Sequence, residues 1–214
     1  MIKENSVVSE CFSDFKIFAY FLLTLWKPKY LSMENRITLH GRYFKPLIPN
    51  AEIEESIDIL AEKINHDFEG VTEEDAPILL CTLNGAMIFM GELLKRINFP
   101  CIVKAAKLSS YEGTRSTGIV KSETVIKGIE GRSIIVVEDI VDTGNTVESM
   151  EKMLFSLGAA DVRICTMLLK PEVYKKNIPL DYVAMEIPNK FIVGFGLDYN
   201  ELGRNTKDIY VLDE

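Results

Sequence analysis

The run Ser133-Ile-Ile-Val-Val137 constrains the fold more than any other segment, because four β-branched residues follow one another without a polar interruption. A strand with one face in water alternates polar and apolar residues, whereas an unbroken run is typical of a parallel strand covered on both faces. Residues 143–157 then carry apolar side chains on one helical face, and Gly158 marks the end of that helix. A buried strand that leads into an amphipathic helix predicts an α/β fold.

The rest of the chain shows the same alternation of strand-like and helix-like segments. Apolar residues recur at helical spacing in residues 52–67, before Gly70, and again in residues 86–97. Successive units of this kind imply right-handed crossovers and a parallel sheet whose ligands bind at the carboxyl ends of the strands. Short apolar runs bounded by breaking residues predict the further strands at residues 77–83, 101–108, 161–169, 182–187 and 191–193.

Charge and cysteine content narrow the possible partners. The chain carries 24 Lys and Arg against 32 Asp and Glu, which gives a net charge of −8. A negative net charge disfavours binding to the negatively charged backbone of a nucleic acid. The 4 cysteines form no CxxC pair, and His40 and His66 stand apart, so no zinc-ligand spacing exists. Three of the cysteines fall in apolar runs, where a buried thiol is typical of a reducing compartment such as the cytoplasm.

The first 32 residues differ from the remainder. Phe15–Trp26 is apolar, but its 12 residues are fewer than the ~20 that a bilayer helix needs, and no small-residue cleavage site follows it. Met33 and the polar residues after it look like a fresh amino terminus. We therefore interpret residues 1–32 as an extension outside the core and residues 33–214 as a single domain. An amphipathic anchor at a membrane surface is the alternative for the extension.

Three carboxylates, Glu138, Asp139 and Asp142, follow the central strand closely, and Thr143-Gly-Asn-Thr146 comes next. A helix N-terminus presents unpaired N–H groups, and Gly144 lets the backbone approach a ligand closely, so this segment is suited to a phosphate. Glu138 and Asp139 are acceptors for sugar hydroxyls or for a divalent cation bound together with a phosphate. The combination indicates a phosphorylated sugar.

From the residues alone, Asp142-Thr-Gly144 is also compatible with two different roles. Asp142 or Thr143 could serve only as the cap of the helix, which is a common use of such side chains. The same triplet after apolar residues also marks aspartic proteases, whose catalysis needs two such carboxylates that share a proton. This chain has one copy, and a helical pattern follows it, whereas those proteases are built from β-structure.

The whole string from Val136 to Thr146 resembles the phosphoribosyl pyrophosphate signature of the type I phosphoribosyltransferases, and matches from Ile78 to Arg204 resemble their hypoxanthine-guanine branch. The resemblance implies an α/β fold with a central, mostly parallel sheet flanked by helices and a small hood region. It implies Mg²⁺ as cofactor, and phosphoribosyl pyrophosphate, a 6-oxopurine base and pyrophosphate as ligands. It also implies a homodimer or homotetramer. The cysteines favour the cytoplasm, the net charge disfavours nucleic acid as a partner, and the short apolar stretch at residues 15–26 disfavours a membrane partner.

For the sugar and its 5′-phosphate, the resemblance implies two groups of residues. Glu138 and Asp139 would hold the ribose hydroxyls and take part in magnesium binding, for which Asp198 is the further ligand. The 5′-phosphate would lie on Thr143, Gly144, Asn145 and Thr146.

For pyrophosphate, the resemblance implies Arg204 and the loop formed by Leu83, Asn84 and Gly85, in which the family has a non-proline cis peptide. Many members have Lys or Arg where this chain has Asn84, so the charge of that side chain is lost here. Ser110 and Tyr111 match the loop that closes over the site and keeps water from the reacting sugar carbon.

For the base, the resemblance implies that Asp142 takes the proton from N7 and that Lys170 contacts the 6-oxo group, where an ammonium donor favours an oxo over an amino purine. Phe191 matches the aromatic that stacks on the base, Ile192 the residue whose backbone meets the purine edge, and Lys190 lies in the same substrate-binding segment. Taken singly, Lys170 could be a solvated strand end and Phe191 a core aromatic.

The implied activity is purine salvage: transfer of a 5-phosphoribosyl group to N9 of hypoxanthine or guanine, which gives IMP or GMP and releases pyrophosphate. One alternative is a nucleotide-sensing regulator that keeps the same fold without turnover. Another is a phosphoribosyltransferase for orotate, uracil or adenine, which would share the phosphate signature but not the surroundings of Lys170 and Phe191. A panel of bases separates these possibilities, including the use of xanthine.

Overall fold

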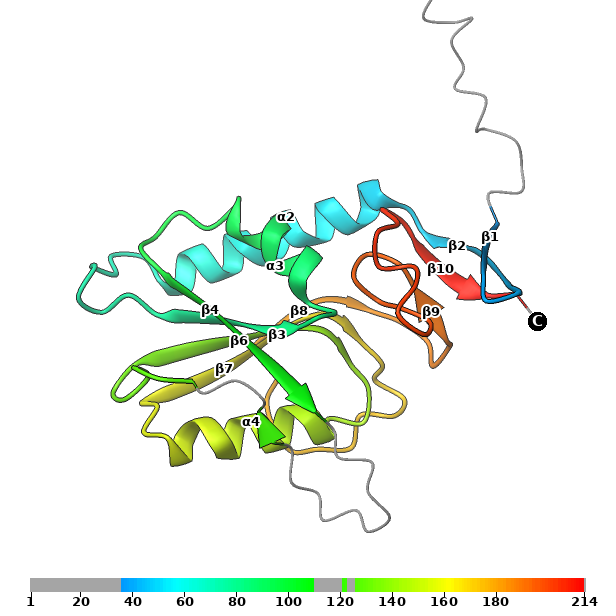
Figure 1. The fold of residues 1–214 in the computed structure, drawn as a ribbon. Helices are drawn as coiled ribbons and strands as arrows, with labels where there is room; N and C mark the ends of the chain where they lie inside the picture. The colour runs from blue at the N-terminus through cyan, green and yellow to red at the C-terminus, as the bar shows by residue number, and fades with distance from the viewer. Residues whose placement is uncertain (1–35, 110–120, 123–125, 214) are drawn as a thin grey trace, which may run out of the picture. The chain divides into compact units, whose positions relative to one another are not determined.

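The computed structural model describes residues 36–109, 121–122 and 126–213, and its elements from Thr38 onward belong to one compact unit. Within that unit a main sheet is ordered β5-β4-β3-β6-β7-β8 (Figure 1). All neighbours in it pair in parallel except β4 and β5, which confirms a mostly parallel sheet. The strands are β3 (Ile78–Leu83), β4 (Ile102–Ser109), β5 (Lys121–Ser122), β6 (Ser133–Val141), β7 (Asp161–Leu169) and β8 (Tyr182–Glu186).

In the described part of the chain, three helices cover the two faces of the main sheet. Helices α2 (Asn50–Asp67) and α3 (Met87–Leu94) lie on one face, and α4 (Asn145–Ser156) lies on the other (Figure 1). Alternate residues of β6 confirm the prediction of burial on both sides. Ile135 and Val137 join the core under α2 and α3, while Ile134 and Val136 join the core under α4.

A small antiparallel sheet forms the hood that the resemblance implies. Its order is β1-β2-β10-β9, so the first and last described strands meet there with the segment after β8. The prediction of a strand near residues 191–193 is confirmed, and this strand lies at the edge of the hood sheet. The short or half-exposed strands of the hood, β1 (Ile37–Leu39), β2 (Arg42–Ile48), β9 (Ile192–Val193) and β10 (Ile209–Leu212), show little of the apolar periodicity that marks the main sheet.

Strand β6 is longer than its apolar run. It continues to Val141, because Glu138 pairs with Thr166 and Ile140 with Leu168 on β7. Glu138 and Asp139 therefore lie in the strand, and only residues 142–144 connect it to α4. The predicted extension 1–32 and the Ser110-Tyr111 loop lie outside the described residues.

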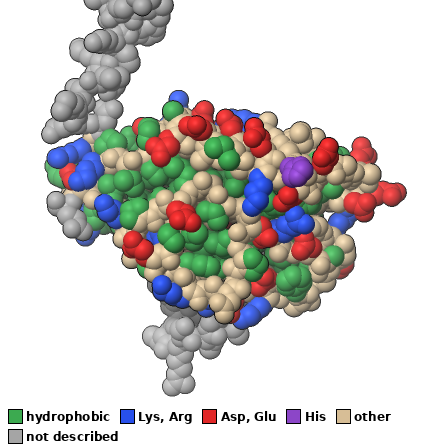
Figure 2. Space-filling model, turned by 180° about the vertical axis from the view of Figure 1, so that it is seen from behind, with side chains coloured by type: hydrophobic (Ala, Val, Ile, Leu, Met, Phe, Trp, Pro, Cys, Tyr) green, Lys and Arg blue, Asp and Glu red, His purple; other side chains and the backbone are tan. Residues whose placement is uncertain are grey.

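Charged side chains of both signs are interspersed over the face shown in Figure 2, and no field of one sign dominates that face. Among the described residues, none of the helices combines the length and apolar character needed to cross a bilayer.

Candidate active site at the carboxyl ends of the strands

Glu138 is buried beside β3 and is held by one hydroxyl. Thr82 Oγ1 donates a hydrogen bond to Glu138 Oε2 at 2.7 Å, and both side chains are buried. The other carboxyl oxygen, Oε1, is buried without a hydrogen-bond partner in the described part of the chain. Burial, followed by the charge of Asp139, raises the pKa of Glu138 to about 8. A buried carboxyl oxygen without a hydrogen-bond partner can accept a hydrogen bond from a polar ligand.

Asp139 lies against the loop that follows β3. Its Oδ1 accepts a hydrogen bond from the amide of Ile140 at 2.8 Å, and burial raises its pKa. A Cβ on Gly85 would overlap the Asp139 carboxylate, so only glycine fits there. The Leu83–Asn84 peptide is cis, as the resemblance implies for the pyrophosphate loop.

Asp142 and Lys170 meet at the ends of neighbouring strands. Val141 pairs with Leu169 in the register of β6 and β7, so the residue after each strand lies beside the other. Lys170 Nζ donates to Asp142 Oδ2 at 3.2 Å, and the Lys170 amide donates to the Val141 carbonyl at 3.0 Å. Lys170 is 8% exposed, which is not a solvated strand end. The structure thus brings the predicted proton acceptor and the predicted base-recognising cation together.

The first turn of α4 carries the predicted phosphate segment. Gly144 is the N-cap, with a left-handed φ of 82°, and no side chain caps the helix. This excludes a capping role for Asp142 or Thr143 in this structure. Thr143, Asn145 and Thr146 are exposed, and the amides that open a helix lack partners within it. The turn therefore presents hydroxyl and amide donors at its open end.

The hood supplies the predicted aromatic. Phe191 is 48% exposed, so it is not a core aromatic, and its ring packs against Phe44 and Tyr199 at centroid distances of 6.2 and 5.7 Å. Ile192 is buried and lies in β9, which pairs with β10 along one edge and leaves the other edge outside the sheet. Lys190 is exposed beside them, on the rim of a hollow that Phe191 also lines.

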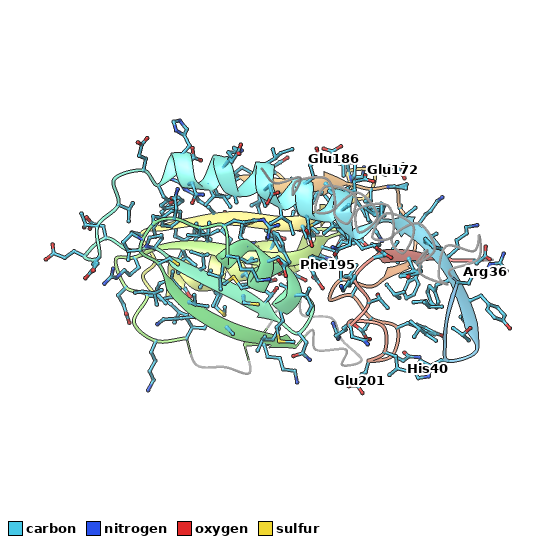
Figure 3. All side chains as sticks on the ribbon, turned by 90° about the horizontal axis from the view of Figure 1, so that it is seen from above. Arg36, His40, Glu172, Glu186, Phe195 and Glu201 are labelled. Carbon is cyan, nitrogen blue, oxygen red and sulfur yellow. The ribbon has the colours of Figure 1, made fainter. Side chains whose placement is uncertain are left out.

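Asp198 and Arg204 form an ion pair with 2.6 Å between Arg204 Nη2 and Asp198 Oδ1. Asp198 Oδ2 accepts from the Glu201 amide, and Arg204 also donates to the Gly196 carbonyl. The charges of Arg204 and Asp198 both act on the pKa of Asp139, in opposite directions. Phe195, from the same segment, lies at the boundary between the hood and the main sheet, whereas His40 and Glu201 lie together farther out on the hood (Figure 3).

The carboxylates suit a magnesium ion that also binds substrate. In the described ranges, no three His, Cys, Asp or Glu side chains gather as a closed metal cluster. Magnesium usually binds through one or two carboxylates together with substrate phosphates and water. The unpartnered Glu138 oxygen and the nearby Asp139 fit that kind of open site, and Asp198 lies close enough to influence Asp139.

Three features of the site were not predicted. Thr82 is the polar residue within an otherwise apolar strand, a signal that it meets a buried polar partner. Gly196 packs so closely on the Gly85 carbonyl that a Cβ would overlap it, which joins the hood to the loop after β3. Tyr174 and Lys176 lie over Gly144, and nothing in their local sequence indicates this contact. Ser110 and Tyr111 remain predictions.

Comparisons with known proteins agree with this architecture. The profile of the phosphoribosyl transferase domain matches residues 48–200. The hypoxanthine-guanine phosphoribosyltransferase of Streptococcus pneumoniae (strain ATCC BAA-255 / R6) is 40% identical over 172 residues, which cover 79% of this chain and 93% of the relative. That of Streptococcus thermophilus (strain CNRZ 1066) is 42% identical over 157 residues, which cover 72% and 85%.

Solved structures give the same result. A hypoxanthine-guanine phosphoribosyltransferase from Bacillus anthracis is 33% identical, with a TM-score of 0.73 over 79% of this chain and 98% of the other. The hypoxanthine phosphoribosyl transferase of Trypanosoma cruzi is 30% identical, with a TM-score of 0.75 over 83% and 95%. The chain therefore belongs to the phosphoribosyltransferase family, among the hypoxanthine-guanine phosphoribosyltransferases.

Proposed function

We propose that this protein transfers a 5-phosphoribosyl group from phosphoribosyl pyrophosphate to N9 of hypoxanthine or guanine, and releases pyrophosphate. The observation that carries the proposal is the Asp142–Lys170 pair, 3.2 Å apart, beside the uncapped first turn of α4. The proposed proton acceptor Asp142 and the proposed base-recognising cation Lys170 therefore lie next to the turn proposed to bind phosphate. The product is a purine nucleoside monophosphate.

The base binds between the hood and the end of β7. The Lys170 ammonium donates to the 6-oxo group of the purine, and it has no acceptor with which to bind the amino group of adenine. The exposed face of Phe191 stacks on the ring, and the free edge of β9 at Ile192 offers backbone groups to the purine edge. Lys190 adds a contact at the rim. These contacts favour hypoxanthine and guanine, and xanthine belongs in the same test.

Asp142 acts as the general base. N7 of the purine must lose its proton as N9 bonds to the sugar carbon, and Asp142 accepts that proton. Lys170 holds the carboxylate in place through its hydrogen bond to Oδ2. A positioned general base of this kind contributes roughly 10²–10⁴ to the rate.

The phosphoribosyl group is aligned from both ends. Thr143, Gly144, Asn145 and Thr146 bind the 5′-phosphate through hydroxyls and amides of the first turn of α4. Glu138 and Asp139 accept the ribose hydroxyls, and Glu138 Oε1 gains the partner that it otherwise lacks. Holding the sugar carbon in line with N9 lowers the entropic part of the barrier.

The pyrophosphate end is bound by Arg204 and by the backbone of Leu83, Asn84 and Gly85. Glu138 and Asp139, or Asp198, would hold Mg²⁺ together with the substrate phosphates, and the ion would supply positive charge to the leaving pyrophosphate. For Arg204 to reach pyrophosphate, its guanidinium must share its donors between Asp198, Gly196 and the ligand. Ser110 and Tyr111 close over the site and exclude water.

We further propose that the protein works in the cytoplasm as a homodimer or homotetramer. Large hydrophobic side chains that are exposed on α3 and β4, namely Met87, Ile88 and Val103, support self-association. A nucleotide-sensing regulator would be favoured if a catalytic group were missing. Among the described site residues, none of the expected catalytic groups is missing.

An absorbance assay with phosphoribosyl pyrophosphate, Mg²⁺ and each of hypoxanthine, guanine, xanthine and adenine tests the function. We expect turnover of the 6-oxopurines and little turnover of adenine. Asp142→Asn keeps the shape and the acceptor for Lys170 but removes the base, so kcat should fall about 10²–10⁴-fold. The matched control is calorimetric binding of ribose 5-phosphate, which should be unchanged in the variant. Absence of turnover with every purine would overturn the proposal and favour the regulator.

A further inference from the structure

The segment that follows β7 folds back over the phosphate-binding turn. The amide of Tyr174 donates to the Lys170 carbonyl at 3.1 Å, and Tyr174 Oη donates to the Ile178 carbonyl at 2.6 Å, so the segment is anchored at both ends. A Cβ on Gly144 would lie 2.5 Å from Tyr174 Cε2 and 2.8 Å from Lys176 Cγ. The aliphatic stem of Lys176 is therefore packed directly on the N-cap of α4.

The ammonium of Lys176 is held by an acid on the same helix. Lys176 Nζ lies 2.6 Å from Glu148 Oε2, and Lys152 Nζ lies 2.8 Å from Glu148 Oε1. The three side chains differ in exposure: Lys176 is 28% exposed, Glu148 33% and Lys152 72%. One lysine thus reaches Glu148 from the phosphate-binding turn, and the other reaches it from the solvent side of the helix.

The phosphate-binding turn contains no cation of its own. Residues 142–146 are Asp, Thr, Gly, Asn and Thr, so the turn offers amides and hydroxyls but no positive side chain to a doubly charged phosphate. Lys176 brings a cation to that turn, because its stem packs on Gly144. Its distal methylenes are flexible, so the ammonium can exchange partners while Cγ stays against Gly144.

We propose that Lys176 binds the 5′-phosphate, and that Glu148 holds its ammonium in the absence of that ligand. The proposal rests on the proposed function, from which it takes the position of the phosphate. When a phosphomonoester occupies the turn, Lys176 Nζ moves from the single carboxylate oxygen to the more highly charged phosphate. Glu148 keeps Lys152 as its partner, so the exchange leaves no charge unpaired.

The alternative role of Lys176 and Glu148 is to clamp the segment onto α4 and nothing more. The two roles predict opposite effects at Glu148. If Lys176 binds phosphate, Glu148→Gln removes the competing acceptor and gives equal or tighter phosphate binding. If the pair is only a clamp, Glu148→Gln should weaken binding as much as Lys176→Gln does.

The test is calorimetric binding of ribose 5-phosphate to the full chain, because this probe lacks both the base and pyrophosphate. We expect Lys176→Gln to weaken binding about tenfold, the scale of one charge-assisted hydrogen bond. Lys152→Gln is the matched control, since it removes the other cation from the same carboxylate, and it should stay within about twofold of wild type. Circular dichroism melting checks that every variant is folded.

Steady-state kinetics give a second measurement. Lys176→Gln should raise KM for phosphoribosyl pyrophosphate about tenfold and leave kcat nearly unchanged, because the phosphate contact is the same in ground state and transition state. Two results would overturn the inference. One is that Lys176→Gln binds ribose 5-phosphate within twofold of wild type. The other is that Lys176→Gln and Glu148→Gln lose affinity for it equally. Lys176-dependent binding of ribose 5-phosphate without turnover of any purine would instead defeat the proposed function and retain the phosphate contact.

Discussion

Glu138 and Thr82 occupy adjacent positions on β6 and β3, and the proposed sugar site depends on the hydrogen bond between them. Glu138 is 6% exposed, and among the described residues its carboxyl group has one hydrogen-bond partner, Thr82 Oγ1, at 2.7 Å. Burial of a carboxyl disfavours its charged form, which agrees with the raised pKa of about 8. The thiol of Cys81, next to Thr82, is also buried, and its pKa is raised to about 11, so it is unreactive at neutral pH.

Thr82→Val retains the side-chain shape and deletes the hydroxyl. Both oxygens of the buried Glu138 carboxyl would then lack partners, so we expect the free energy of unfolding to fall by about 1–3 kcal/mol. Thr82→Ser restores a donor and should recover most of the loss. Urea denaturation at neutral pH measures both variants. Equal stability of wild type and Thr82→Val would show that Thr82 does not satisfy Glu138.

At the scale of elements, the loop after β3 is fitted between β6 and the segment that follows β9. Gly85 has no room for a Cβ beside the Asp139 carboxylate, and Gly196 has none beside the Gly85 carbonyl. The position of this loop, the proposed pyrophosphate site, therefore depends on Asp139 of the neighbouring strand and on the hood. Gly91, farther on in α3, has open space around it.

Alanine in place of Gly85 should lower activity, whereas alanine in place of Gly91 should raise stability. Gly85→Ala forces Asp139 to move, so kcat/KM should fall by about 100-fold, the scale of a displacement of about 1 Å at a reacting group. Gly91→Ala is the matched control, and it should raise stability by roughly 0.5–1 kcal/mol because alanine favours a helix interior. Initial rates and thermal unfolding measure the two effects. Full activity of Gly85→Ala would contradict the assigned fit.

At the scale of the whole molecule, Tyr182 connects three elements at the end of the sheet away from the site. From β8, its hydroxyl donates to Asp67 Oδ2 on α2 at 2.9 Å and accepts from Arg163 Nη1 on β7 at 2.9 Å. Burial is the main cause that raises the pKa of Tyr182 to about 12. The neutral phenol therefore stabilises the folded state.

This linkage predicts a pH dependence of stability at the alkaline end. The folded pKa lies above the unfolded value of about 10, so the contribution of Tyr182 is fully present below pH 10 and is lost as the pH rises toward 12. The stability advantage of wild type over Tyr182→Phe should shrink across that range. Urea denaturation of both proteins at a series of pH values measures the difference. A constant difference would contradict the prediction.

Most of the main sheet was predictable from local patterns. The boundaries of β7 agree with the predicted residues 161–169, and α2 begins two residues before the predicted helix. The full length of β6 was not predicted, because Glu138 and Asp139 end the apolar run. The strand continues past them because it still pairs with β7. The hood strands were mostly missed, since their residues become strands by pairing across the chain, as β2 does with β10.

Local patterns in the sequence predicted the α/β class, the proposed phosphate-binding segment at Thr143–Thr146 and the residue types of the candidate site, because these depend on neighbours along the chain. No local pattern indicated that Asp142 meets Lys170, that Thr82 holds Glu138 or that Lys176 lies on Gly144, because these contacts form only in the folded chain. Two of these contacts join residues 28 and 56 positions apart in the sequence. The third places the segment after β7, which contains Lys176, on the first turn of α4. Strand order and register create them, and a local pattern of apolar and polar residues does not encode either one.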